Sequence, residues 1–197
     1  MDIVLKKPNP NEVNKYLRTW DSLENYTLQE SSLRKLFTNT YPKNVCMDDI
    51  LIKVCSLNDF YSTNIYSPFK VAKHIHSLNI DNRLSKGDEK LVNDIAKIKV
   101  NKDKTMNFYS FATKYCSHHQ PLLYPIYDNY VIKVLNYFNK QDKFSKFTFQ
   151  ELKDYPKFKN VILDFRSFYG LDKFNLKEID KYLWQVGKEK FPRKYSR

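Results

Sequence analysis

The amino-acid sequence predicts an all-α protein, a bundle of helices with little or no sheet. Apolar residues recur at intervals of three and four along almost the whole chain, which is the spacing of helices that bury one face. Glycine is rare, with 3 residues among 197, and this argues against an architecture of tight β-hairpins. The segment with the alternating pattern of a strand is short, Phe144–Phe149.

The helices are expected in regular succession, and period counting gives about nine or ten of them. The first follows Pro10, the second begins at Thr27, where Glu30 completes a capping-box pattern, and Ser67 before a proline marks a later start. Further patterns of helical spacing lie at Ile50–Leu57, Leu91–Ile98, Phe108–Cys116 and Val131–Phe138.

The C-terminal third shows start and stop signals as well. Capping-box patterns predict helix starts at Thr148 and Asn175, because a glutamate follows each of them three residues later. Gly170 and Gly187 stand where the C-caps of these helices are expected.

The composition favours one compact domain with an anionic partner. A length of 197 residues suits a single domain over residues 1–197, with room for two lobes around a central cleft. Hydrophobic residues make up 42% and aromatic residues 16%, which excludes a disordered chain. Lys and Arg total 34 against 22 Asp and Glu, so the formal charge is +12 and a polyanion is the expected partner.

The same residues set expectations for location and assembly. No uncharged apolar run approaches the roughly 20 residues of a membrane helix. The three cysteines are odd in number and sparse, which argues against a secreted disulfide framework. We therefore expect a cytoplasmic or nucleoid-associated monomer with no membrane contact.

The segment from Glu89 to Phe138 carries the clearest functional pattern. A helix at about 88–98 is predicted to run through a polar turn, 100–105, into a second helix at about 106–117. A loop with Pro121 and Pro125 follows, and Asp128 then stands at the N-cap of the next helix. Backbone N–H groups there would hold its carboxylate in the ionised form.

This order of parts resembles the helix-hairpin-helix DNA glycosylase superfamily, most closely its 8-oxoguanine DNA glycosylase branch. In that family the essential acid follows a proline and an apolar residue, as Asp128 follows Pro125 and Ile126 after one extra residue. The resemblance implies that Asp128 is catalytic. It also implies that the turn binds DNA through Lys102, Lys104 and Thr105.

A second match lies upstream, where Val54–Asp59 is similar to the Cys-Ser-Ser-Asn-Asn stretch of the same family. By the resemblance, Asn58 would enter the gap left by a flipped base and contact the orphaned partner. Asp59 replaces the family's second asparagine, and both residues are expected at the DNA. A flipped base would lie against Phe108, Tyr127 and His119.

The chain departs from the family pattern at the hairpin. The turn holds no glycine, so Lys102 and Lys104 would contact phosphates by side-chain charge. Members that also cleave the DNA strand carry a nucleophilic lysine where this chain has Phe108 or Tyr109. Lys104, one helical turn earlier, is our candidate for a displaced nucleophile, whereas Lys114 is expected on a different side of that helix.

The sequence therefore predicts a glycosylase that flips an altered base out of double-stranded DNA and hydrolyses its N-glycosidic bond without a cofactor or metal. The altered base would be oxidised or otherwise modified. The missing lysine favours a monofunctional enzyme over a lyase. The alternative is a catalytically silent DNA-binding or protein-interaction module of the same fold, for example in antiphage defence.

Overall fold

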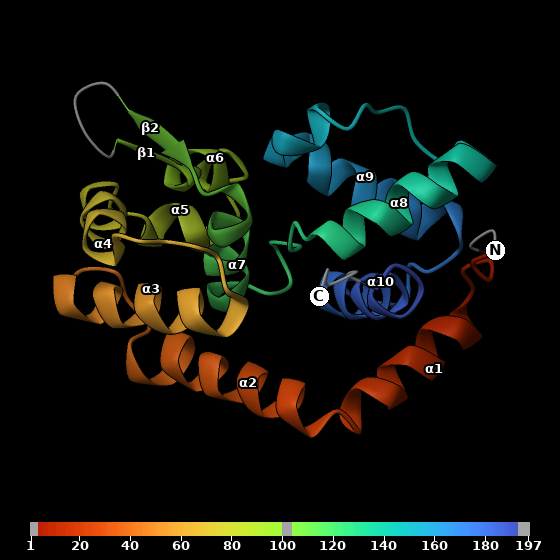
Figure 1. Ribbon diagram of the computed structural model, residues 1–197, viewed down its shortest axis with the longest axis horizontal. Helices are drawn as coiled ribbons and strands as arrows, with labels where there is room; N and C mark the ends of the chain where they lie inside the picture. Colours follow the sequence, from red (N-terminus) through yellow and green to blue (C-terminus); the bar gives the residue numbers. More distant parts are fainter. Residues whose placement is uncertain (1–3, 100–103, 193–197) are drawn as a thin grey trace, which may run out of the picture.

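The computed structural model describes residues 4–99 and 104–192, and the all-α prediction is confirmed there (Figure 1). The described helices of the first half are α1 Pro10–Asp21, α2 Glu24–Arg34, α3 Met47–Tyr61, α4 Pro68–Ser77, α5 Asp81–Ser85 and α6 Lys90–Ala96. Those of the second half are α7 Tyr109–His119, α8 Asn129–Asp142, α9 Tyr155–Phe168 and α10 Leu176–Lys190. A π-helical turn, η1 Lys35–Thr40, extends α2, and a 3-10 turn, η2 Glu151–Lys153, precedes α9.

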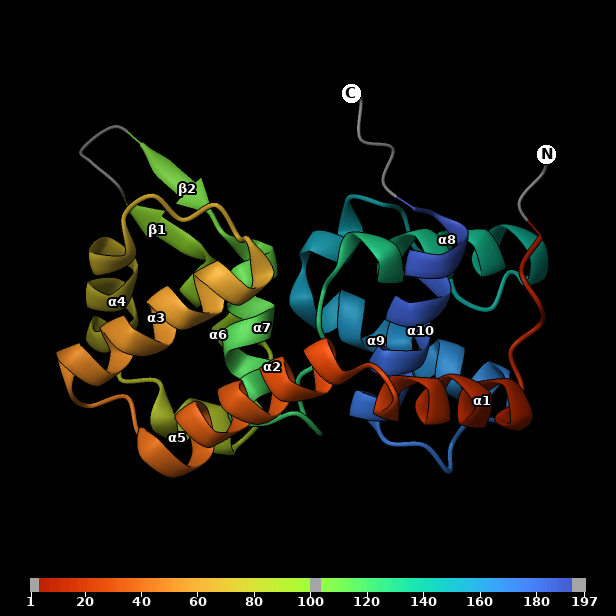
Figure 2. The same cartoon turned by 60° about the horizontal axis from the view of Figure 1, so that its bottom comes forward.

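The helices form two lobes that lie side by side (Figures 1 and 2). The first lobe comprises α2 to α7, and the second comprises α8 to α10 with α1 packed against α10. The α1–α2 segment passes from one lobe to the other along the lower edge of Figure 1. On the opposite side the Tyr155 hydroxyl of α9 donates a hydrogen bond to the Pro125 carbonyl oxygen at 2.9 Å.

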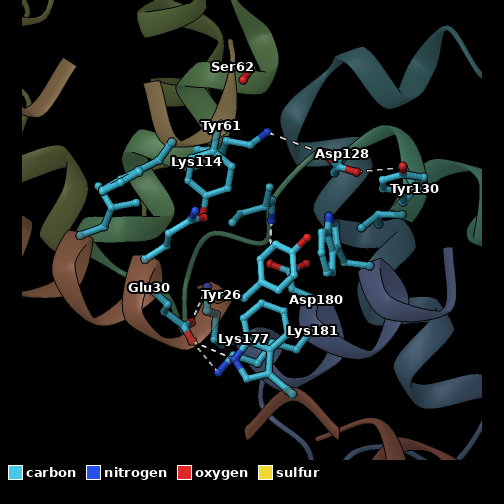
Figure 3. A pocket seen from close by; sticks show the side chains of 17 residues that line it. Tyr26, Glu30, Tyr61, Ser62, Lys114, Asp128, Tyr130, Lys177, Asp180 and Lys181 are labelled. Carbon is cyan, nitrogen blue, oxygen red and sulfur yellow. Dashed lines mark hydrogen bonds and ion pairs between the residues drawn. The ribbon is translucent and has the colours of Figure 1, made fainter. Parts of the chain in front are cut away.

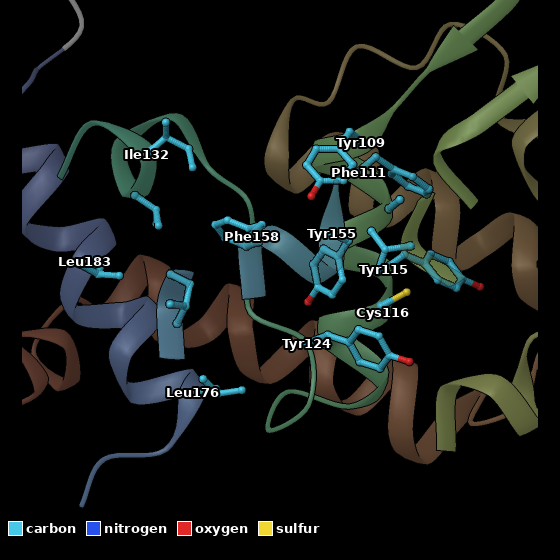
Figure 4. Close-up of a cluster of buried hydrophobic side chains, with 14 of the residues drawn as sticks. Tyr109, Phe111, Tyr115, Cys116, Tyr124, Ile132, Tyr155, Phe158, Leu176 and Leu183 are labelled. Atoms are coloured by element: carbon cyan, nitrogen blue, oxygen red, sulfur yellow. The ribbon is translucent and has the colours of Figure 1, made fainter. Parts of the chain in front are cut away.

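The hydrophobic core continues from one lobe into the other. Tyr115, Tyr124 and Tyr155 are fully buried where the lobes meet, and Figure 4 shows them beside Phe158 of α9. The Tyr109 hydroxyl reaches across to the Leu152 carbonyl oxygen at 3.2 Å. Large aromatic rings thus join the lobes, which fixes the relative position of the side chains that face each other between them.

The predicted helical hairpin is wrong in its local structure. The helix α6 ends at Ala96, and the chain continues into an antiparallel ribbon of β1 Lys97–Lys99 and β2 Thr105–Asn107 in which Ile98 lies opposite Met106. Only Ile98 is buried among the residues of β1, so the burial follows the two-residue period of a strand. A run this short fits both periods, which is why the sequence pattern did not separate them.

Three further expectations concern single elements. No strand forms at Phe144–Phe149, because this segment is a loop with Phe144 turned into the core. Thr27 lies inside α2 instead of capping it, and its hydroxyl donates to the Glu24 carbonyl oxygen at 3.0 Å. The capping box of Asn175 and Glu178 is confirmed.

Gly187 is not a C-cap but an interior residue of α10 that allows close packing. A Cβ atom at this position would lie 2.6 Å from both the Cβ atom and the carbonyl oxygen of Tyr130. Glycine therefore lets α10 approach the first turn of α8. This approach places the N-terminus of α8, with Asp128, beside the side chains of α10.

Candidate functional site

A cavity of about 250 Å³ lies between the two lobes. It is bounded by α2, the end of α3, α7, the start of α8 and α10 (Figure 3). Its aromatic lining consists of Trp20, Tyr26, Phe60, Tyr61, Tyr130 and Trp184. Its charged lining consists of Glu30, Lys114, Asp128, Lys177, Asp180 and Lys181.

Asp128 occupies the predicted N-cap position. Its Oδ1 atom accepts a hydrogen bond from the Tyr130 backbone N–H at 2.9 Å, at the start of α8. Its Oδ2 atom points into the cavity, 4.0 Å from the Lys114 Nζ atom (Figure 3). The cap fixes the carboxylate in place at the positive end of the helix dipole, where negative charge is favourable.

Lys114 projects into the same cavity from α7 with its side chain only 4% exposed. The ammonium group donates to the Ser110 Oγ atom at 2.6 Å and lies 5.2 Å from the centre of the Tyr61 ring. Burial lowers the pKa of Lys114, although the charges of Asp128 and Asp180 oppose this shift. A buried amine with a lowered pKa holds more of its neutral, nucleophilic form at neutral pH.

The position of Lys114 is a feature that our sequence reasoning missed. The residues of α7 from Phe111 to His118 are all buried, so that no face of this stretch is left for solvent. A lysine inside such a stretch must point into the protein interior or into a cavity. The burial of α7 on every side would have indicated the position of Lys114, but this burial is known only from the structure and not from the sequence.

Asp180 of α10 forms the floor of the cavity. Its Oδ2 atom accepts the Ile126 backbone N–H at 2.8 Å, whereas its Oδ1 atom is buried with no hydrogen-bond partner within the described part of the chain. Burial raises the pKa of Asp180 to about 7. The sequence signal was a carboxylate on the apolar face of α10, since Leu176 and Leu183 are buried on the same side.

Glu30 closes the lower end of the cavity by linking the lobes (Figure 3). Its carboxylate binds Lys177 at 3.1 Å and Lys181 at 2.8 Å, both on α10, and accepts the Trp20 indole N–H at 3.2 Å. Burial by itself raises the pKa of Glu30, but the two lysines outweigh it and the net pKa lies below the usual value.

An aromatic cluster of Trp20, Tyr26 and Trp184 covers the adjoining wall. The ring of Trp184 lies 5.0 Å from that of Tyr26 and 5.8 Å from that of Trp20, in edge-to-face geometry. Such a wall offers flat apolar surface to a planar ligand.

The residues expected to hold a flipped base do not line this cavity. Phe108 precedes α7 and packs against the core, and Tyr127 meets Tyr109 edge to face with the ring centres 4.9 Å apart. His119 contacts Asn44 at 3.2 Å and Lys53 at 3.5 Å, and burial lowers its pKa to about 3. All three contribute to packing, because their partners belong to the core of the lobes and not to the cavity wall.

The residues carried over as DNA contacts near the end of α3 have different surroundings. The Asn58 Oδ1 atom accepts from the Thr63 hydroxyl at 2.8 Å and the Ile65 backbone N–H at 2.9 Å, so the amide braces the following loop. These bonds hold the amide oxygen against the protein, and the contact of Asn58 with an orphaned base stays a prediction. Asp59 lies exposed on the last turn of α3.

Two of the predicted hairpin contacts lie on the exposed ribbon. Lys104 and Thr105 are both exposed at the start of β2, and neither lines the cavity. Lys114 faces Asp128 in the cavity, whereas Lys104 lies outside its lining, and the role of a displaced nucleophile for Lys104 stays a prediction. Lys102 lies outside the described residues.

Neither a metal cluster nor a membrane-spanning helix is found in the described ranges. No three His, Cys, Asp or Glu side chains of residues 4–99 and 104–192 come together as metal ligands. His74 and His76 each contact a backbone carbonyl oxygen instead, those of Asp94 and Val45. Among the same residues no helix is both long and apolar enough to cross a bilayer.

The fold and the cavity define a two-lobed helical protein with an acid–lysine pocket. The chain belongs to the family HI_0787_N, described as an N-terminal domain, whose model matches residues 12–123. This match includes Lys114 and ends before Asp128. An uncharacterized protein of Haemophilus influenzae is 49% identical over 148 residues, which cover 75% of this chain and 70% of that protein. No solved structure matches the chain.

Proposed function

We propose that the protein is a DNA glycosylase that binds an altered base in the cavity between its lobes and excises it. The observation that carries this proposal is the pairing of Lys114 and Asp128 at 4.0 Å on the wall of an aromatic-lined cavity. A fixed carboxylate beside an amine of lowered pKa suits the chemistry of a sugar carbon that gains positive charge. The resemblance to the helix-hairpin-helix glycosylases independently points to Asp128.

In the proposed reaction the bond between C1′ of the sugar and the base nitrogen breaks. The base leaves with the bonding electron pair, and the Asp128 carboxylate stabilises the positive charge that develops on the sugar. The neutral Lys114 amine forms the new bond to C1′ and releases a proton, which balances the proton that the departing base takes up. The sequence alone favoured water as the nucleophile because no lysine stands at position 108 or 109. Lys114 supplies that amine from later in α7.

The remaining lining residues fit a planar heterocycle. The aromatic cluster of Trp20, Tyr26 and Trp184 provides apolar surface, while a rotation of the Asp180 side chain would present its buried, unpartnered Oδ1 atom to a ligand at the floor. With a pKa of about 7, Asp180 presents either a carboxylate or a carboxylic acid to the edge of a base. Burial without another partner makes an interaction with a ligand favourable at this oxygen.

The DNA itself would lie across the lobes and along the ribbon. The formal charge of +12 favours a polyanion, and Lys104 and Thr105 stand exposed where the ribbon projects from the first lobe (Figure 1). Flipping a base costs a few kcal/mol, and phosphate contacts together with stacking in the cavity would offset this cost.

A panel of duplexes with oxidised, alkylated, deaminated and hypermodified bases tests the function. We expect abasic sites with at least one duplex, and loss of this product in Asp128→Asn and Lys114→Met. Lys159→Met is the matched control, because Lys159 is a partly buried lysine that pairs with Glu89 at 2.9 Å away from the cavity.

Borohydride trapping separates the two nucleophiles. A covalent adduct with DNA that disappears in Lys114→Met supports attack by the amine, whereas base release without an adduct indicates attack by water. Binding of DNA with no release from any duplex would reject the enzyme and favour the silent module.

A further inference from the structure

A second cavity, of about 330 Å³, adjoins the first one. We call it the rear cavity. Its own lining comes from the end of α1, the loop that follows α7 and the start of α10, and consists of Leu17, Asp21, Pro121, Leu122, Asn175 and Glu178. None of these residues lines the first cavity. The rear cavity therefore has its own surface, formed by segments on both lobes.

Three side chains line both cavities: Trp20, Lys177 and Lys181. All three converge on Glu30, through ion pairs of 3.1 Å and 2.8 Å to the lysines and a hydrogen bond of 3.2 Å from the indole N–H. The Lys181 ammonium also lies 4.9 Å from the centre of the Trp20 ring. Because Trp20, Lys177 and Lys181 line both cavities and Glu30 binds all three, we call these four side chains the partition between the cavities; Figure 3 shows Glu30 with the two lysines.

The helix α10 borders the cavities one after the other. Trp184 and Asp180 face the first cavity, Lys177 and Lys181 face both, and Glu178 faces the rear cavity alone. A helix rises about 1.5 Å per residue, so Asp180 is only about 4.5 Å along the axis from Lys177. A ligand at the Asp180 floor is therefore next to the partition.

The partition is built from groups that can move. Lysine and glutamate side chains have several rotatable bonds, and the carboxylate and both ammonium stems remain 21–24% exposed to solvent. This exposure leaves each of these side chains a path into solvent when its ion pair opens. Rotation of Lys177 and Lys181 away from Glu30 would connect the two cavities without a change in the backbone.

We propose that the rear cavity is a binding site for the free, excised base and its exit from the protein. This inference rests on the proposed function, in which DNA covers the site at Asp128 while the base is cut. The freed base would then be trapped between the DNA and the partition. The Trp20 indole lines both cavities and offers apolar contact to a planar heterocycle, and at the rear the capping box leaves the Asn175 side-chain NH2 group and the Glu178 Oε1 atom to offer hydrogen bonds.

The test fills the rear cavity and leaves the first one unchanged. Leu122 is 58% exposed and lines the rear cavity alone, so Leu122→Trp adds a large ring there without disturbing the core. We expect excision in a single turnover to stay within twofold of the wild type. Release of the base from the complex with abasic DNA should slow at least tenfold. The measurement is rapid separation of free base from protein-bound base.

Two further variants make the outcome specific. Glu30→Gln removes the charge that holds the partition, and we expect it to speed base release. Phe149→Trp is the control, because Phe149 is 54% exposed and lines neither cavity. Wild-type release from Leu122→Trp would overturn the exit, since the base would then leave by the DNA-facing side.

Binding of free 2-aminopurine keeps this proposal distinct from the proposed function. If the wild type excises no base, the function fails, but the rear cavity is still tested by this probe. Loss of 2-aminopurine binding in Leu122→Trp with retention in Lys114→Met supports the rear site. If Leu122→Trp still binds 2-aminopurine and Lys114→Met does not, the probe binds in the first cavity, and the proposed rear site is overturned.

Discussion

Two buried lysines, Lys53 and Lys114, differ in how their ammonium groups are satisfied. Lys53 is fully buried and donates to the carbonyl oxygens of Tyr41 and Lys43 at 3.0 and 2.9 Å and to the Asn44 Oδ1 atom at 2.7 Å. An ammonium group has three N–H donors, so each one has a partner. Lys114 donates to Ser110 alone, to its Oγ atom at 2.6 Å and its carbonyl oxygen at 3.4 Å, and faces Asp128 at 4.0 Å across the cavity.

The comparison shows that burial of a charge does not by itself indicate function. The pKa of Lys53 is lowered by burial to about 8, yet its three hydrogen bonds tie the 41–44 segment to α3 and leave no group for a ligand. The pKa of Lys114 is lowered by the same cause, but its amine borders empty space. Incomplete hydrogen bonding at the edge of a cavity is the feature that distinguishes a reactive site from a structural network.

The largest expected effect is the loss of excision in Lys114→Met. Because methionine keeps the volume of the side chain but carries no amine, base release should fall on the order of a thousandfold. Single-turnover excision of the best substrate measures it. Excision within tenfold of the wild type would remove Lys114 from the reaction.

The substitutions Lys53→Met and Lys114→Met should affect stability in the opposite order to activity, with the larger loss at Lys53. Lys53→Met removes the donor from the carbonyl oxygens of Tyr41 and Lys43 and should lower the free energy of unfolding by about 3 kcal/mol, since each such group costs roughly 1–3 kcal/mol. Lys114→Met removes a charge 4.0 Å from Asp128, whose carboxylate keeps its N-cap hydrogen bond, so it should cost less stability than Lys53→Met. Urea denaturation of both variants measures the difference. Equal losses would show that Lys114 is also structural.

Local features of the site were predictable from the sequence, whereas contacts between distant segments were not. The cap at Asp128 and the box of Asn175 and Glu178 depend on backbone N–H groups within three residues, so their patterns are sufficient. His119 was assigned to the pocket, but its partner Asn44 lies 75 positions away in the sequence. No local pattern contains that contact.

The ribbon and the position of Lys114 in the cavity were missed for a related reason. The ribbon replaced a helical turn because Ile98 alternates with two exposed lysines, and three residues do not determine a period. Lys114 of α7 and Asp180 of α10 line one cavity although they are far apart in the sequence. The site is therefore assembled by packing between lobes, and only its N-capping acid could be predicted.

A smaller effect is expected in the pH dependence of stability. The pKa of Asp180 is about 7 in the folded protein against an ordinary value near 3.8, so the folded state binds a proton that the unfolded state has lost. The stability from this proton is complete below about pH 4 and is lost as pH rises to about 7. Lys177 and Lys114 oppose the shift, and Asp128 adds to it.

Asp180→Asn should remove this slope, because an amide does not titrate. The expected gain in the free energy of unfolding at pH 8 is on the order of 2 kcal/mol relative to the wild type. Chemical denaturation between pH 4 and pH 8 measures it. Parallel stability profiles for the two proteins would show that Asp180 stays ionised in the cavity.

The smallest expected effect concerns the ribbon. Its residues Lys104 and Thr105 are exposed to solvent, in contrast to the buried side chain of Lys114 in the cavity. If Lys104 contacts one phosphate, Lys104→Ala should reduce the salt dependence of DNA binding by about one unit of slope and leave excision at saturating DNA unchanged. Lys140→Ala is the matched control, because Lys140 is an exposed lysine on the far half of α8. Binding measured from low to moderate salt gives both slopes. An equal slope for Lys104→Ala and the wild type would place the DNA away from the ribbon, and equal reductions in both variants would show that the lysines act only through net charge.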